Sequence, residues 1–348
     1  MEESKRERSM EQIIITEEKV REYISSQKDA KIGIDGSKME QMVKDLNTLG
    51  YAIIEDVFGE QETDILRKRL WKEYIEKVFL GVNFEDKTTW KEYFPYINAY
   101  GIFSGSVCQT QVLWDIRMNR KLKSLFSHIW NTKELSVSMD GCCLMCPNNI
   151  RPSPIYNRPW PHVDQYVSEL NTPPEGFKSE STLETEPYTI QGQVLLTDSL
   201  TDNRGFWCYP KSHLEPQETI FGFTLCMNED EKNRYTGNKF KNPTKLKAKK
   251  GSVILWDSRL FHWNRWANDE DEIEDPDIER MVTYVCYTPK SRSSNIQKYY
   301  KRDIIMSRLG TTHNPNIFCS IDNSYIKGSI NRESDYLIPF PVVDSSLL

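Results

Sequence analysis

The sequence has few histidines and no long apolar run, and both scarcities narrow what the chain can be. Only five histidines occur among its 348 residues, so the candidate imidazole ligands for a metal form a short list. No apolar run reaches the roughly 18 residues that a transmembrane helix needs. The charged start, Met1–Arg8, lacks the apolar segment of a secretory signal peptide. We therefore expect a cytoplasmic protein without a membrane span.

A basic surface and a zinc-type cysteine pattern are also missing. The net charge of −6 argues against a nucleic-acid binder, which would normally carry a basic footprint. The eight cysteines, without a secretory signal, indicate reduced thiols. Cys142, Cys143 and Cys146 have no second ligand pair at a matching spacing. They are interpreted as thiols of a buried strand rather than as zinc ligands.

Apolar periodicity predicts helices in the first part of the chain. Residues 1–36 are charged and are interpreted as a partly helical N-terminal extension. A helix is predicted from Ser37, where Ser37-Lys-Met-Glu40 fits a capping box, to Gly50, which suits a helix C-cap. A strand is predicted over 51–57, and further helices over 60–80 and 112–130.

Short apolar segments separated by turn residues follow, and they indicate a barrel or sandwich of strands. The predicted strands lie near 135–146, 160–167, 188–198, 205–209, 220–226, 252–257 and 281–288. The charged stretches 227–250 and 267–279 are interpreted as solvated loops. We expect one domain over 37–290, mainly β with flanking helices, and a C-terminal extension over 291–348 that packs on the barrel exterior or covers its mouth.

The stretch Trp160-Pro-His162-Val-Asp164 carries the first chemical signal. In a strand, residues two apart point to the same face, so His162 and Asp164 converge. An imidazole and a carboxylate are two thirds of the 2-His-1-carboxylate triad that holds iron(II) with open positions. A chance tripeptide is the alternative, so a second histidine is required.

His262 is the candidate for that second histidine. It follows the apolar strand Val253–Trp256 and a polar turn, about a hundred residues after Asp164. Such a separation suits a jelly roll in which the ligands come from different strands. A structural histidine packed among aromatic residues is the alternative.

Arg280 is the candidate anchor for an acidic cosubstrate such as 2-oxoglutarate. It opens a strand-like segment in which Val282, Tyr284 and Cys286 share its face. A guanidinium pairs with a carboxylate through two parallel hydrogen bonds. The alternative is an exposed arginine that pairs with the acidic loop.

The order of motifs resembles the phytanoyl-CoA dioxygenase family of iron(II)/2-oxoglutarate oxygenases. The resemblance covers most of residues 37–290. Its motifs are Gly50-Tyr-Ala-Ile-Ile54, Ser138-Met-Asp-Gly141, Trp160-Pro-His162-Val-Asp164-Gln165, Ile190-Gln-Gly-Gln-Val-Leu-Leu196, Asn203-Arg-Gly205-Phe-Trp-Cys-Tyr-Pro-Lys-Ser212-His213, and Gly251-Ser-Val-Ile-Leu-Trp-Asp257 through His262 to Arg280. Lys211 and Ser252 depart from the family pattern, which usually has Gly and often Asp at these turns.

The resemblance implies a double-stranded β-helix, or jelly roll, with His162, Asp164 and His262 as iron(II) ligands. It also implies that Arg280 binds 2-oxoglutarate and that O₂ is the oxidant for hydroxylation of a small molecule. A carboxylate at Asp164 implies hydroxylation or desaturation rather than halogenation. Further candidates for the cosubstrate pocket or the metal surroundings are Gln165, Gln191, Gln193, Trp256 and Trp263. His128, His213 and His313 are interpreted as structural or exposed.

Two other functions stay open at this stage. One is a catalytically silent jelly-roll interaction protein, and the other is a cupin-type metal enzyme that does not use 2-oxoglutarate. The sequence indicates neither a particular substrate nor an oligomeric state.

Overall fold

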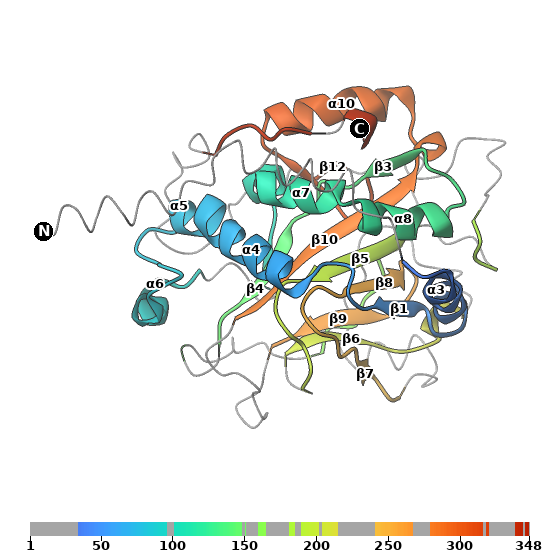
Figure 1. The fold of residues 1–348 in the computed structure, drawn as a ribbon, viewed down its shortest axis with the longest axis horizontal. Helices are drawn as coiled ribbons and strands as arrows, with labels where there is room; N and C mark the ends of the chain where they lie inside the picture. The colour runs from blue at the N-terminus through green and yellow to red at the C-terminus, as the bar shows by residue number, and fades with distance from the viewer. Residues whose placement is uncertain are drawn as a thin grey trace, which may run out of the picture.

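The computed structural model describes residues 34–95, 101–147, 150, 159–164, 181–184, 189–201, 204–214, 241–266, 279–315, 318–319, 338–343 and 345–347. Among the helices in these ranges, none combines the length and the apolar character needed to cross a bilayer. The helices are α3 (Gly36–Leu49), α4 (Glu60–Leu70), α5 (Glu76–Val78), α6 (Trp90–Tyr93), α7 (Gln111–Met118), α8 (Arg120–Ile129) and α10 (Asn295–Met306) (Figure 1).

The strands are β1 (Tyr51–Ile54), β2 (Ile102–Phe103), β3 (Leu135–Val137), β4 (Cys142–Met145), β5 (Ile190–Leu195), β6 (Gly205–Cys208), β7 (Thr244–Lys245), β8 (Val253–Asp257), β9 (His262–Arg265), β10 (Arg280–Pro289), β11 (Gly310–Thr311) and β12 (Phe318–Cys319). Most of the predicted strands therefore exist, some of them shorter than expected. The predicted strand over 220–226 lies outside the described residues, as do residues 1–33, 165–167 and 267–278.

Helix α3 has the predicted end but not the predicted start. Gly50 ends it in the left-handed region at φ 85°, and its N–H donates to the carbonyl of Leu46. The predicted capping box at Ser37 is wrong, because the helix begins at Gly36 and Asp35 is the N-cap. The Asp35 carboxylate accepts the Ser37 N–H at 3.1 Å. A charged acceptor two residues earlier therefore draws Ser37 into the helix.

The helix predicted over 60–80 is confirmed, as α4 and α5 joined by a π-helical turn over Trp71–Ile75. The predicted loop over 227–250 needs a correction, because it contains β7. Lys245 in β7 is only 6% exposed and donates to the carbonyl of Thr201. Because Lys245 lies in a basic run, the sequence did not indicate that its ammonium would be buried and hydrogen-bonded.

The helix predicted over 112–130 is two helices broken at Asn119. That residue leaves the helical conformation at ψ 125°, and its side chain accepts the N–H of Leu122 to cap α8. Phe126 of α8 packs on Tyr287 of β10 with ring centroids 4.9 Å apart. Figure 1 shows α7 and α8 lying across the sheet that contains β10.

Two antiparallel sheets form the β-rich part of the molecule. The large sheet has the order β1-β8-β5-β10-β4-β2, with β3 also paired to β10, and the small sheet has the order β7-β6-β9. A β-bridge joins His162 to His262 in β9 and extends the small sheet by one position.

These orders give the predicted fold. The chain places β4, β5, β8 and β10 in the large sheet and His162, β6, β7 and β9 in the small one. Their spatial orders, β4-β10-β5-β8 and His162-β9-β6-β7, are those of an eight-stranded jelly roll. The expectation of a mainly β protein with flanking helices on a jelly-roll core is confirmed.

The inner faces of the two sheets meet through side chains. Phe206 of β6 packs on Trp256 of β8 with centroids 4.7 Å apart. Gly192 of β5 faces the other way, because a Cβ there would lie 3.4 Å from Phe126 of α8. Strand alternation therefore turns Gln191 and Gln193 into the space between the sheets.

One of the two turn departures from the family pattern carries backbone strain. Lys211 has φ 70°, in the left-handed region that glycine adopts without a steric penalty. This conformation explains why a glycine is usual at that turn.

The C-terminal extension contacts the barrel along β3 and the link between β3 and β4. Lys301 of α10 donates to the Ser136 hydroxyl of β3. The backbone N–H of Thr311 in β11 donates to the carbonyl of Met139 at 2.9 Å. The chain beyond β10 therefore packs against β3 and the link between β3 and β4.

Candidate metal centre

The small sheet sets His162 and His262 side by side. The N–H of His162 donates to the carbonyl of His262 at 3.0 Å, and the reverse bond is 2.9 Å long. This reciprocal pair fixes the two residues directly opposite each other. Their rings lie 4.3 Å apart, and the indole of Trp160 stacks on His162 at 4.3 Å with a 4° angle between the planes.

Asp164 completes the cluster from the position two residues after His162. Its Oδ2 lies 3.2 Å from Nε2 of His262 and 3.7 Å from Nε2 of His162. Its backbone N–H donates to the carbonyl of Ser258 at 3.0 Å, which fixes this part of the chain. Among the described residues, this is the group of three whose potential ligand atoms lie within 4.8 Å of one another.

The outer nitrogen of each ring is occupied by a backbone carbonyl. Nδ1 of His162 lies 3.2 Å from the carbonyl of Trp160, and Nδ1 of His262 lies 2.8 Å from the carbonyl of Leu260. A hydrogen on Nδ1 satisfies each carbonyl and leaves the Nε2 lone pair directed at the centre. The arrangement therefore presents two nitrogen lone pairs and a carboxylate oxygen to one point.

The electrostatics of the cluster favour a cation at that point. Burial, together with the neighbouring His262, lowers the pKa of His162 to about 3, so its ring is neutral. Burial acts to raise the pKa of Asp164, but His313, His162 and His262 outweigh it and hold that pKa well below its usual value. An ionised carboxylate beside the neutral imidazole of His162 is a combination of donors that binds a metal cation.

Arg280 is buried at the start of β10 and is surrounded by neutral polar groups. One Nη donates to Oδ1 of Asn264 at 2.9 Å and to Oε1 of Gln193 at 3.4 Å. The other Nη contacts Sγ of Cys143 at 3.1 Å. Within the described part of the chain, Nε has no partner and no carboxylate pairs with this guanidinium. The alternative of an exposed Arg280 therefore does not hold, since only 3% of this residue is accessible.

The other predicted pocket residues fall into separate places. Gln191 donates from Nε2 to Oδ2 of Asp164 at 3.1 Å, and the ring of Trp256 lies 5.3 Å from that of His262. Trp263 packs instead with Val163, Tyr209 and Phe261 on the other face of the small sheet. Gln165 lies outside the described residues.

Sequence reasoning overlooked Asn264 at the centre and interpreted His313, which also lies there, as structural or exposed. Asn264 lies two positions after His262 on the same face of β9, and it bonds both Arg280 and the Tyr284 hydroxyl, the latter at 3.0 Å. Strand alternation from His262 would have found it. His313 has Nδ1 3.9 Å from Oδ2 of Asp164, and no local pattern signals this contact.

The remaining histidines and the described cysteines lie apart from this chemistry. Nε2 of His213 lies 3.1 Å from the carbonyl of Asn47, beside the end of α3, in agreement with a structural role. His128 is exposed on α8. Cys142, Cys143 and Cys146 are buried thiols, as expected.

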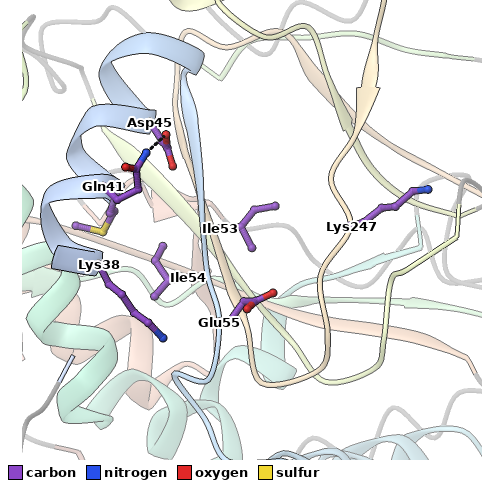
Figure 2. A pocket seen from close by; sticks show the side chains of 8 residues that line it. Lys38, Gln41, Asp45, Ile53, Ile54, Glu55 and Lys247 are labelled. Carbon is purple, nitrogen blue, oxygen red and sulfur yellow. Dashed lines mark hydrogen bonds between the residues drawn. The ribbon is translucent and has the colours of Figure 1, made fainter. Parts of the chain in front are cut away.

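A cavity of about 280 Å³ opens elsewhere, between α3, β1 and Lys247. Figure 2 shows the charged side chains of Lys38, Asp45 and Glu55 around it. None of the His–Asp–His residues lines it, so it is separate from the candidate centre.

A family model matches the part of the chain that contains the His–Asp–His cluster. The model described as phytanoyl-CoA dioxygenase (PhyH) matches residues 46–263, more than half of the chain. His162, Asp164 and His262 lie inside this match, whereas Arg280 and His313 lie beyond it.

Individual relatives are distant. Ava biosynthesis cluster protein O of Aspergillus versicolor is 24% identical over 262 residues, which cover 70% of this chain and 76% of that protein. The epimerase SnoN, solved with Fe3+, alpha ketoglutarate and nogalamycin RO, has 12% identity and a TM-score of 0.48, covering 73% of this chain and 84% of that one. HygX from Streptomyces hygroscopicus, solved with nickel and 2-oxoglutarate, has 14% identity and a TM-score of 0.47, covering 74% and 88%. Similarities at this level carry over no activity.

Proposed function

The chain belongs to the phytanoyl-CoA dioxygenase family, and from that premise we propose that it is an iron(II)- and 2-oxoglutarate-dependent dioxygenase that hydroxylates a C–H bond of a small molecule. The observation that carries the proposal is the convergence of two imidazole nitrogens and one carboxylate oxygen on a single point, with ligand atoms within 4.8 Å of one another.

The donor set suits iron(II). Two imidazoles and one carboxylate on one side of a metal are the facial triad of non-haem iron(II) oxygenases, which leaves positions for other ligands. His162, Asp164 and His262 would hold the ion. Their donor atoms are preset by the backbone bonds to Nδ1 and by Gln191 on the carboxylate, so binding requires little rearrangement.

The surroundings of Arg280 suit a dicarboxylate. A buried guanidinium without a carboxylate partner is costly, and an anionic ligand offsets that cost. Asn264 links this guanidinium to the strand of His262, two residues or roughly 7 Å along β9. A dicarboxylate that reaches the metal with one end would pair its other carboxylate with Arg280, and Gln193 would hold the guanidinium in place.

When bound, iron(II), 2-oxoglutarate and O₂ together supply the oxidising power for the C–H bond, with conversion of 2-oxoglutarate into succinate and CO₂. The protein's own contribution is orientation and exclusion of water. Trp160, Phe206 and Trp256 pack on the two imidazoles and shield them, with ring centroids between 4.3 and 5.3 Å. A carboxylate at the position of Asp164 favours hydroxylation or desaturation over halogenation.

The proposal is tested by metal and cosubstrate binding followed by succinate release. Asp164→Ala should lose Co(II) binding, measured by titration, and succinate release in the presence of iron(II) and 2-oxoglutarate. His128→Ala, at an exposed histidine, should match wild type. If Asp164→Ala kept both properties, the assignment would be wrong.

The same assays separate the alternatives. Wild-type protein that binds metal but not 2-oxoglutarate would point to a cupin-type enzyme. Wild-type protein that binds neither would point to a silent interaction protein.

A further inference from the structure

The C-terminal segment Leu309–Asn314, called the strap from here on, carries a third imidazole to the metal centre. Nδ1 of His313 lies 3.9 Å from Oδ2 of Asp164, the oxygen that faces the two other imidazoles. The His313 side chain is 28% exposed, whereas those of His162, Asp164 and His262 are 7%, 10% and 5% exposed. His313 therefore approaches the centre from its solvent side.

The strap is held by hydrogen bonds to Gln109 and to Met139. The side-chain amide of Gln109 donates to the carbonyl of Leu309 at 2.6 Å. Met139 and Thr311 bond twice, since the Thr311 N–H donates to the Met139 carbonyl and the Met139 N–H donates to the Thr311 hydroxyl oxygen at 2.7 Å. His313 thus stands two residues from an anchored position.

Close packing fixes the strap further. A Cβ on Gly310 would lie 2.7 Å from Sγ of Cys108 and 2.9 Å from the carbonyl of Met139. Both distances are shorter than side chains tolerate, so the strap lies against the β3–β4 link as only a glycine allows. The approach of His313 to Asp164 is therefore built into the fold.

We propose that His313 is a positioning residue of this centre, whose Nδ1–H holds the metal-binding carboxylate of Asp164 together with the amide of Gln191. The inference rests on the proposed function, because it concerns the same metal site. Carboxylate ligands need hydrogen-bond donors that orient them, and such outer partners commonly control metal affinity. Gln191, in the large sheet, supplies one donor, whose Nε2 lies 3.1 Å from Oδ2 of Asp164. His313, in the strap, supplies a second.

The geometry places His313 outside the ligand set. Its ring nitrogens are not part of the group of atoms within 4.8 Å of one another that His162, Asp164 and His262 form. At 3.9 Å the contact is longer than a hydrogen bond, and contacts of this kind tighten when a site is filled. A fourth metal ligand is accordingly the competing role, and spectroscopy distinguishes the two.

The test is Co(II) titration of the full-length protein, followed through the visible d–d bands. We expect His313→Ala to weaken Co(II) binding about 10- to 100-fold while leaving the shape and intensity of the bands unchanged. His313→Asn should restore most of the affinity, because its amide nitrogen lies as many bonds from Cβ as Nδ1 does. His313→Gln places its amide at the Nε2 position and should behave like the alanine variant. His128→Ala is the matched control and should bind as wild type.

Three results would overturn the inference. One is wild-type affinity in His313→Ala, another is rescue by Gln rather than Asn, and the third is a changed d–d intensity that reports loss of a ligand. Urea unfolding of each variant separates a local effect from a folding defect. Wild-type protein that binds Co(II) but not 2-oxoglutarate would end the proposed function, whereas the His313 comparison would still decide the positioning role.

Discussion

Replacing Arg280 by methionine tests the dicarboxylate anchor, because it removes the charge and keeps an unbranched side chain. In the structure Arg280 is 3% exposed, and the described partners of its guanidinium, Asn264, Gln193 and Cys143, are all neutral. The substitution should therefore affect the protein with a bound anion much more than the ligand-free protein.

With 2-oxoglutarate bound, Arg280 would be one half of a buried ion pair. Removing one partner of such a pair costs about 3–5 kcal/mol, which corresponds to an affinity about 140- to 3,700-fold weaker. Without ligand, the variant loses the cost of burying an uncompensated cation but leaves Oδ1 of Asn264 without its donor, a penalty of about 1–3 kcal/mol. These two effects oppose each other, so the ligand-free variant should stay folded with a free energy of unfolding close to that of wild type.

The assay is isothermal titration of 2-oxoglutarate into Co(II)-loaded protein, combined with urea unfolding of the ligand-free form. Arg265→Met is the matched control, since Arg265 belongs to β9 but places its guanidinium 5.3 Å over the ring of Trp207. Arg280→Lys should retain part of the affinity, because the charge remains without the planar fork. Affinity in Arg280→Met within threefold of wild type, or an equal loss in Arg265→Met, would refute the reasoning.

The remaining predictions each concern a single residue. Oδ1 of Asn264 lies 2.9 Å from the Arg280 guanidinium, so Asn264→Asp would place a carboxylate against it. This variant should resist urea better without ligand and should bind 2-oxoglutarate at least tenfold more weakly, as measured by calorimetry. Gly50→Ala should lower the free energy of unfolding by at least about 1–2 kcal/mol, because this helix end has φ 85°. Lys211→Gly should raise it by up to about 1 kcal/mol in the same urea assay, since the φ of 70° then carries no steric penalty. Burial raises the pKa of the Cys108 thiol to about 12 from 9.0, so mass spectrometry should find it unalkylated by iodoacetamide at pH 8.5 unless urea is present. Because the unfolded thiol ionises first, this group should also reduce stability as the pH rises from about 9 to 12.

Local alternation and helix punctuation were predictable from the sequence. The pairing of His162 with Asp164, the face shared by Arg280 and Tyr284, and the end of α3 at Gly50 all depend on residues close together in the chain. The short strands separated by turn residues predicted a barrel or sandwich. The family resemblance of the motifs then implied the jelly roll that the structure has.

Two kinds of feature could not be predicted from the sequence. One is which of several neighbouring residues caps or ends a helix, and the other is which residues far apart in the chain come into contact. Asp35 outcompetes Ser37 for the cap of α3, and Asn119 divides an otherwise continuous helical pattern. Lys245 is buried because the Thr201 carbonyl accepts its ammonium, a contact that charge patterning does not reveal. His313 lies about 150 residues after Asp164 in the sequence. It reaches Asp164 because Met139 holds the strap at Thr311.

The reciprocal backbone hydrogen bonds between His162 and His262 fix the spacing of these two candidate metal ligands within the sheet. Residues paired in this way keep their Cα atoms about 5.5 Å apart whatever the side chains or loops around them. The loops that join the strands between them can lengthen, shorten or change sequence without altering this Cα spacing. Such a division leaves the His–Asp–His cluster constant while the surrounding loops are free to diversify.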